Sequence, residues 1–168
     1  MKRLFIIAII IMSVISCKRS TDFYVLNVGQ KIHHDDFEYS VSNYMVTNYL
    51  RYGRDTLHAS GMYYLVKFRV DNNAKRVSHE WNNNIGYIID GAGNKFENIP
   101  AVQQFFQKSH KFDLREHYIT PAGSSDSTFL AFDIPLNVTR PCLMVRGETL
   151  MGDALDRGKF RRMMIKLF

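Results

Sequence analysis

The chain has 168 residues and a formal net charge of +6 at pH 7, and 46% of its residues are hydrophobic. This length fits one domain with a substantial buried core. The charge is a mild basic excess without a recognisable nucleic-acid-binding module, so we expect no nucleic acid partner. The only cysteines are Cys17 and Cys142, and this excludes a disulfide framework.

The first residues have the pattern of a secretory signal. Lys2 and Arg3 precede an apolar run over residues 4–15, in which only Ser13 is polar. As a helix the run would span roughly 18 Å, at about 1.5 Å per residue, which is too short for a hydrocarbon core of about 30 Å. We therefore expect this segment to be removed on export.

The residues Val14-Ile15-Ser16-Cys17 resemble the lipobox of bacterial lipoproteins, in which an aliphatic and a small residue precede the lipidated cysteine. The resemblance implies a covalent lipid on Cys17. More than one acyl chain there would hold the protein stably at a membrane. Two alternatives stay open, an ordinary secretory signal with a chance cysteine and a short uncleaved anchor.

Cleavage before Cys17 would divide the chain into a signal peptide over residues 1–16, a lipidated tether over 17–22 and a domain over 23–168. In the sorting known for some bacterial lipoproteins, Asp after the cysteine retains the protein in the inner membrane. Lys18 stands at that position here. The resemblance therefore implies a lipid-anchored protein of the cell envelope, in the outer membrane and facing the periplasm. We expect no cofactor besides the lipid on Cys17.

From residue 23 onward, short runs of aromatic and β-branched residues alternate with Gly, Asn, Asp and Pro, which is typical of an all-β domain. In residues 62–70, Tyr64, Val66 and Phe68 share one face of a strand predicted to be half-buried. Strands are predicted at residues 24–28, 36–46, 62–70, 85–90, 95–97, 128–133, 143–146 and 160–167. The pattern favours a single antiparallel immunoglobulin-like β-sandwich of about seven or eight strands.

One segment, residues 101–119, departs from the strand pattern. Val102, Phe105, Phe106 and Ser109 have helix-like spacing, and a proline precedes them. We expect a short helix-containing insertion. It is either a functional connection or a cap that covers one open end of the core.

Two residues are predicted to lie in the core. Cys142 belongs to the apolar run Cys142-Leu143-Met144-Val145, so a buried thiol is expected there. Trp81, the only tryptophan, is expected to pack against the sandwich core.

Five stretches along the chain occur in an order that is typical of one group of exported bacterial proteins. They are Val28-Gly29-Gln30; Phe37-Glu38-Tyr39-Ser40-Val41; Tyr64-Leu65-Val66-Lys67-Phe68-Arg69-Val70-Asp71-Asn72; Ile88-Ile89-Asp90-Gly91-Ala92-Gly93-Asn94-Lys95-Phe96; and Pro121-Ala122-Gly123-Ser124-Ser125 leading to Phe132-Asp133-Ile134-Pro135. In this arrangement the chain resembles the telokin-like domain family. The resemblance implies an immunoglobulin-like sandwich without established catalytic activity and without functional residues to transfer. The chain departs from the pattern at residues 102–118 and 152–159.

Common catalytic motifs are missing from the sequence. There is no Gly-x-Ser-x-Gly elbow, no phosphate-binding loop and no His-Glu-x-x-His. We therefore do not expect an enzyme. A hydrolase or lyase whose residues converge from distant segments stays open as an alternative.

The histidines give weak metal candidates. His33 and His34 precede two aspartates, but adjacent residues in a strand point to opposite faces, so we expect a solvated turn and no metal site. His110 and His117 would share a face only if the whole segment between them were helical. We expect structural or surface histidines there.

Two connections are the candidate interaction sites, since loops on a rigid sandwich commonly carry binding. In residues 51–60 the candidates are Arg51, Tyr52 and Arg54. In residues 102–118 they are Lys108, His110, Lys111, Arg115 and His117. The first hypothesis is a noncatalytic module that binds another envelope protein or a surface polymer through these loops.

A second hypothesis is a periplasmic protein that binds a small ligand or a metal. A pocket lined by Tyr44, Tyr49, Tyr52 and Trp81 would favour a small ligand. A cluster of His33 and His34 with a further donor would favour a metal. The partner and the oligomeric state do not follow from the sequence.

Overall fold

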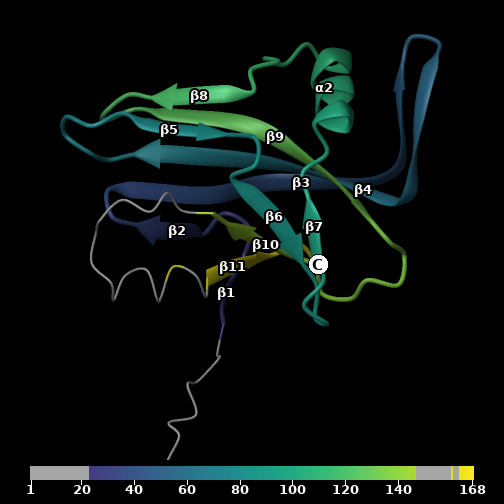
Figure 1. The fold of residues 1–168 in the computed structure, drawn as a ribbon, viewed down its shortest axis with the longest axis horizontal. Coiled ribbons are helices and arrows are strands. Elements are labelled where there is room, and N and C mark those ends of the chain that lie inside the picture. Colours follow the sequence, from purple (N-terminus) through teal and green to yellow (C-terminus); the bar gives the residue numbers. More distant parts are fainter. Residues whose placement is uncertain (1–22, 147–159, 161–162) are drawn as a thin grey trace, which may run out of the picture.

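Two β-sheets pack face to face in the computed structural model, which describes residues 23–146, 160 and 163–168 (Figure 1). The four-stranded sheet has the order β2–β3–β4–β9, with β2 (Lys31–His34), β3 (Phe37–Tyr52), β4 (Asp55–Asn72) and β9 (Ser125–Ile134). The five-stranded sheet has the order β1–β11–β10–β6–β7, with β1 (Tyr24–Leu26), β6 (Gly86–Ile89), β7 (Lys95–Glu97), β10 (Cys142–Val145) and β11 (Met163–Lys166). A two-stranded sheet pairs β5 (His79–Asn82) with β8 (His117–Thr120).

The predicted all-β sandwich with a short helix is confirmed. The described residues form eleven strands, more than the seven or eight expected. The strands not predicted, β2, β5 and β8, have four residues each and contain polar residues, so they lack a run of apolar side chains. Among the described strand pairs, β1 with β11 is parallel, and the others are antiparallel.

The main core lies between the two large sheets. Both sheets contribute apolar side chains that are fully buried in this core. Burying one such side chain stabilises the fold by about 1.5–3 kcal/mol. Ile32, Val41, Val66, Phe68, Val70, Ile88, Leu130, Phe132, Leu143 and Ile165 are all 0% exposed.

Strand β4 is buried on both faces over part of its length, which corrects the half-buried strand predicted for residues 62–70. Val66 and Phe68 belong to the core between the sheets. Tyr63 and Leu65, on the opposite face, belong to a second hydrophobic cluster with Phe106. The second cluster exists because the predicted insertion folds back over the outer face of this sheet.

The helix α2 (Pro100–Ser109) covers that outer face. Proline at its first turn has no backbone N–H to satisfy, so it starts the helix without cost. Val102 and Phe106, one turn apart, point into the second cluster. The segment is therefore a cover for the four-stranded sheet, and it lies over a sheet face and not over an open end of the core.

Both residues predicted for the core are confirmed there. Trp81 is 5% exposed, stacks on Tyr118 at 4.1 Å between ring centroids and donates from Nε1 to Thr120 Oγ1 at 2.9 Å. Cys142 is buried as a free thiol, and burial raises its pKa. A protonated buried thiol is unreactive as a nucleophile.

No helix within the described part of the chain is long and apolar enough to cross a membrane. The signal peptide, Cys17 and the tether predicted from the sequence lie outside the described residues, as do residues 152–159.

Candidate interaction site

A two-stranded arm projects from the four-stranded sheet. Strand β9 ends at Ile134, which pairs with Met62, so the part of β4 before Met62 pairs only with β3. We call this hairpin, residues 47–60, the arm; it rises beside α2 at the right of Figure 1. Residues 51–60 are thus not a loop, as the sequence indicated, because only Gly53 and Arg54 form the turn. Gly53 has a φ of +62°, which a glycine adopts without strain.

An irregularity in the strand pairing separates the arm from the sheet. The register shifts between Thr47, which pairs with Tyr63, and Tyr49, which pairs with His58. Strand β4 therefore has more residues than β3 at this point, and such bulges bend a strand. At the bulge, Gly61 is required, because a Cβ added there would lie 2.2 Å from the carbonyl oxygen of Ile134.

The carboxylate of Asp133 holds this bulge in place. It accepts hydrogen bonds from Ser60 N at 2.7 Å, Ser60 Oγ at 2.8 Å and Gly61 N at 3.0 Å. Partial burial by itself would raise the pKa of Asp133, but these hydrogen bonds outweigh it and lower the pKa below its usual value. The carboxylate is therefore charged at neutral pH, and the arm is attached at a defined orientation.

The two faces of the arm differ. On the face toward α2, Leu50 and Leu57 pair and join the second hydrophobic cluster, and the Tyr52 ring meets the edge of Phe105 at 6.4 Å between centroids. On the other face, Tyr49 pairs with His58 and has its ring 6.3 Å from that imidazole.

We call this second side the free face. Tyr49 is 50% exposed there, and Arg51 and His58 are also exposed. The free face thus presents one aromatic ring and two basic side chains on a supported hairpin.

The structure separates the three candidates of the first connection. Arg51 lies on the free face, since it alternates with Leu50 and Tyr52 along β3. Tyr52 is 41% exposed and lies on the face toward α2, and Arg54 is at the turn. The two predicted connections are nevertheless neighbours, because the arm packs against the helix of the second.

Most candidates of the second connection lie around the end of α2. Lys108 is exposed in its last turn. His110 packs its ring on Phe106 at 4.3 Å between centroids, and the helix ends where Phe112 N–H donates to the Gln107 carbonyl at 2.8 Å. Lys111 follows, exposed, with a φ of +57°. His110 and His117 do not share a helix, because α2 stops at Ser109 and His117 begins β8.

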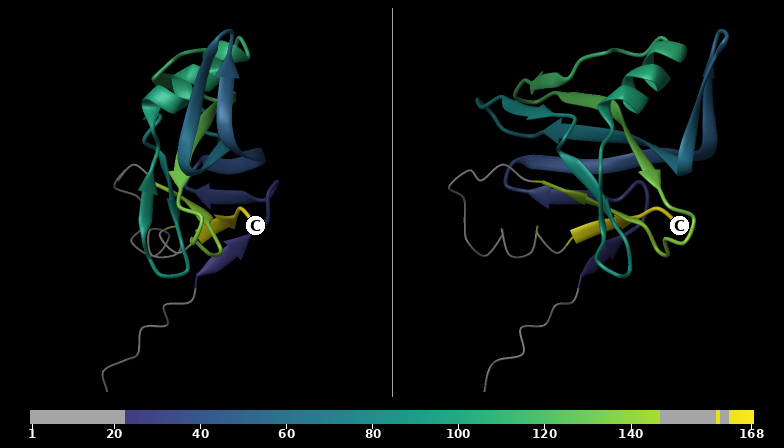
Figure 2. Two further views of the ribbon diagram at one scale, coloured as in Figure 1. Left: turned by 90° about the vertical axis from the view of Figure 1, so that its right-hand side faces the viewer. Right: turned by 45° about the vertical axis from the view of Figure 1, so that its right-hand side comes forward.

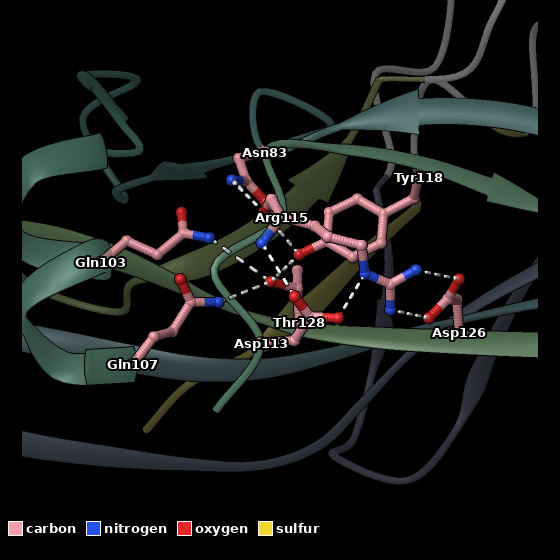
Figure 3. Close-up of polar contacts among 8 residues, drawn as sticks. All are labelled: Asn83, Gln103, Gln107, Asp113, Arg115, Tyr118, Asp126 and Thr128. Atoms are coloured by element: carbon pink, nitrogen blue, oxygen red, sulfur yellow. Dashed lines mark hydrogen bonds and ion pairs between the residues drawn. The ribbon is translucent and has the colours of Figure 1, made fainter. Parts of the chain in front are cut away.

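Arg115 makes several contacts within the fold. Its guanidinium pairs with Asp113 and, at 3.0 Å, with Asp126, and it lies 4.8 Å from the centre of the Tyr118 ring (Figure 3). Its carbonyl accepts a hydrogen bond from the Tyr118 hydroxyl at 2.9 Å. Arg115 therefore fastens the connection between α2 and β8.

A buried polar cluster joins α2 to the sheet beneath it, and sequence reasoning missed it. The Thr128 hydroxyl oxygen lies 2.7 Å from the Tyr118 hydroxyl and 3.1 Å and 3.4 Å from the amide nitrogens of Gln107 and Gln103 (Figure 3). Burial raises the pKa of Tyr118, so its hydroxyl stays protonated and donates to the Arg115 carbonyl. The available signal was the spacing of the two glutamines, which puts them on the same side of the helix as Val102 and Phe106.

His33 and His34 point to opposite faces of β2. His33 is exposed, with Nδ1 3.7 Å from Glu38 Oε1, whereas His34 is buried with its ring 4.4 Å from Phe160. The expected solvated turn is wrong for these residues, which form a strand; the turn follows at Asp35 and Asp36. In the part of the chain that the structure describes, no group of three or more His, Cys, Asp or Glu is placed to hold a metal.

The pocket suggested for Tyr44, Tyr49, Tyr52 and Trp81 does not form. Trp81 is in the core against Tyr118, Tyr44 stacks on Tyr64 at 6.3 Å, and Tyr49 and Tyr52 lie on opposite faces of the arm. This arrangement removes the grouping on which the small-ligand hypothesis was based.

No protein-family model and no curated protein matches the sequence. Solved structures are similar in fold. The yjhA protein from Bacillus subtilis has a TM-score of 0.58 at 13% identity, covering 84% of this chain and 98% of that one. The secreted protein MPT63 from Mycobacterium tuberculosis has a TM-score of 0.54 at 12% identity, covering 88% and 99%.

An uncharacterized β-sandwich protein from Clostridium difficile has a TM-score of 0.52 at 13% identity, covering 90% of this chain and 98% of that one. None of these three names describes an enzyme. At such identities the likeness concerns the fold alone, and the chain adopts the β-sandwich fold that these bacterial proteins share.

Proposed function

We propose that the protein is a noncatalytic lipoprotein of the bacterial cell envelope that binds another envelope protein through the arm. In this proposal it is a telokin-like domain held by a lipid on Cys17, in the outer membrane and facing the periplasm. The observation that carries the binding role is the arm itself, a hairpin that leaves the sheet and is supported at its base.

The support of the arm favours binding. A flexible hairpin would lose conformational entropy when a partner orders it, and this loss weakens association. Here Asp133 fixes the bulge, and the pair Leu50 and Leu57 packs against the cluster under α2. The free face is therefore preorganised before a partner arrives.

The chemistry of the free face favours a protein partner. Tyrosine and arginine are enriched among the residues that dominate binding energy in protein interfaces. Tyr49 and Arg51 lie on the same face of β3, two positions apart, with His58 opposite Tyr49. A surface polymer is the other outcome that the test below distinguishes.

The arm is tested by photo-crosslinking in the native envelope. A benzophenone amino acid at position 49 is compared with one at Ile119, which is 61% exposed on β8, away from the free face. We expect one protein adduct from position 49 and none from position 119. In affinity capture with the protein without the crosslinker, the double variant Tyr49→Ala/Arg51→Ala should lower recovery of that protein at least about tenfold, as expected for two central interface residues.

Other outcomes would contradict the proposal. Equal labelling at both positions would mean that the arm has no special role, and adducts of heterogeneous mass without peptide content would indicate a polymer. The lipid is tested separately by mass spectrometry of the membrane-extracted protein. We expect an acylated N-terminal peptide beginning at Cys17, and an unmodified chain in a Cys17→Ser variant.

A further inference from the structure

The outer face of the five-stranded sheet is apolar. Strand pairing places Val25 beside Met164, and Met144 beside Tyr87, on this side of the sheet. The hydrophobic cluster at its centre is built, within the described residues, from β6, β10 and β11, and its members Cys142, Met144 and Met164 are only 5–9% exposed. The corresponding face of the four-stranded sheet is covered by α2.

A groove of about 600 Å³ runs along this apolar face. It is lined by side chains from both ends of the domain, among them Phe23, Val25, Met164 and Phe168. Phe23 is 47% exposed, Val25 53% and Phe168 61%. Large apolar side chains that gather at this exposure mark a surface that contacts something other than water.

Basic side chains surround the apolar residues. Arg140 lines the groove and is exposed, and it makes no ion pair with any described residue. Lys95 and Arg146 lie over the Tyr87 ring, at 5.2 Å and 4.6 Å from its centre.

Two acidic groups lie nearby, against three basic ones. Asp90 lines the groove and is charged, because the Asn94 side-chain amide and the backbone N–H groups of Ala92 and Asn94 donate to its carboxylate and lower its pKa. Glu97 pairs with Arg146 at 2.6 Å. An apolar centre with a basic rim is the composition of a surface that lies on an anionic lipid interface.

The length of the chain before the domain brings this face to the membrane. Phe23 follows Cys17 by six positions, which span at most about 20 Å even when fully extended. A lipid on Cys17, as proposed above, therefore holds the groove within about 20 Å of the bilayer, with Lys18 and Arg19 between them. This step of the inference rests on the proposed lipid anchor.

We propose that the outer face of the five-stranded sheet docks on the surface of an anionic phospholipid bilayer, with Phe23, Val25 and Phe168 entering its interfacial region. The docked protein then has a defined orientation. The arm and β1 lie at opposite ends of the molecule in both Figure 1 and Figure 2, so docking through the part that contains β1 keeps the arm at a distance from the membrane. Docking would thus present the arm to partners in the aqueous compartment.

The test uses a fluorophore that reports on the depth of one position. The variants carry Cys142→Ala and one new cysteine labelled with a nitrobenzoxadiazole, at Val25 or, as the control, at Ile119, which is 61% exposed. Each is made as the lipid-modified protein and as a lipid-free Cys17→Ser form. Vesicles contain phosphatidylethanolamine with or without phosphatidylglycerol.

We expect the fluorescence emission of the label at position 25 to shift to shorter wavelength and to be quenched by spin-labelled lipids. This should occur for the lipid-modified protein, and for the lipid-free form on vesicles that contain phosphatidylglycerol. The label at position 119 should stay in water. Arg140→Gln should weaken vesicle binding of the lipid-free form about fivefold, the equivalent of about 1 kcal/mol for one basic side chain near an anionic surface. Arg54→Gln, at the turn of the arm, should not change it.

The outcomes separate this inference from the anchor. If the lipid-modified protein binds the vesicles but the label at position 25 remains in water, the proposed docking of the five-stranded sheet is wrong and the proposed lipid anchor is retained. If mass spectrometry finds no lipid on Cys17 while the lipid-free form still inserts position 25, the anchor fails and the docking face stands. Equal insertion of positions 25 and 119 would overturn the defined orientation.

Discussion

The outer faces of the two sheets differ in how they are covered. The four-stranded sheet is covered by α2, whose Phe106 packs on Leu65 and Ala131 and whose glutamines reach the Thr128 hydroxyl. On the five-stranded sheet the central residues Cys142, Met144 and Met164 are buried, but Phe23, Val25 and Phe168 beside the groove are exposed. One outer face is thus covered by the protein's own helix, whereas the other has exposed apolar side chains at its edge, for which we proposed docking on a membrane.

The largest expected effect tests this difference directly. Phe106→Ala removes a ring that is 4% exposed and should lower the free energy of unfolding by about 3–5 kcal/mol. Tyr87→Ala, on the open face, should cost less than about 1.5 kcal/mol. Urea unfolding followed by circular dichroism measures both. Equal losses would mean that the open face is as much a part of the core as the covered one.

The base of the arm comes next. Gly61→Ala puts a Cβ against the Ile134 carbonyl, 2.2 Å away, and should destabilise the fold by about 2–3 kcal/mol with faster amide exchange in residues 47–60. Gly91→Ala is the control, since its Cβ would meet the nearest atom, the Thr139 carbonyl oxygen, at 3.7 Å. If both variants behave like the parent protein, the arm is not held as described.

Acid should weaken the core between the two sheets through His79, whose ring packs on Phe37 and Tyr39. Burial first, and the neighbouring His34 second, lower the pKa of His79 from 6.5 to about 4. In the unfolded chain the His79 side chain is protonated below about pH 6.5, whereas in the folded protein it is protonated only below about pH 4. The free energy of unfolding therefore decreases as the pH falls from 6.5 to 4. We expect a loss of about 2 kcal/mol between pH 8 and pH 5.

Urea unfolding at several pH values measures this loss. A His79→Gln variant should show a flatter profile, and His117→Gln, at an exposed strand position, should keep the parent slope. A profile that His79→Gln leaves unchanged would assign the acid sensitivity to other groups.

The smallest expected loss of stability comes from removing the ion pairs of Arg115, which lies between α2 and β8. Arg115 is 47% exposed, so its pairs with Asp113 and Asp126 are partly screened by water. Arg115→Gln should cost about 0.5–1 kcal/mol at low salt, and the difference should shrink in concentrated salt. A loss of several kcal/mol that salt does not change would place Arg115 in the core of the covered side.

Sequence reasoning succeeded where a signal is local. The alternation around Phe68 predicted β4, the spacing of Val102 and Phe106 predicted α2, and Trp81 was expected in the core. It failed where the signal is spread over distant segments. Residues 51–60 have a polar composition typical of a loop, yet they belong to a hairpin whose Leu50 and Leu57 pack in the cluster under α2 and whose base Asp133, far along the chain, binds at Ser60.

The sequence by itself determined the fold class, the two buried residues Trp81 and Cys142 and the presence of a short helix, because side-chain periodicity along one segment expresses which face meets the core. Only the tertiary structure decided which sheet α2 covers, how the arm bends and where apolar side chains stay exposed. These features depend on contacts between residues far apart in the chain, such as Asp133 with Gly61 and Val25 with Met164. A periodic pattern contains the orientation of a side chain within its own element, but not the identity of the surface that it meets.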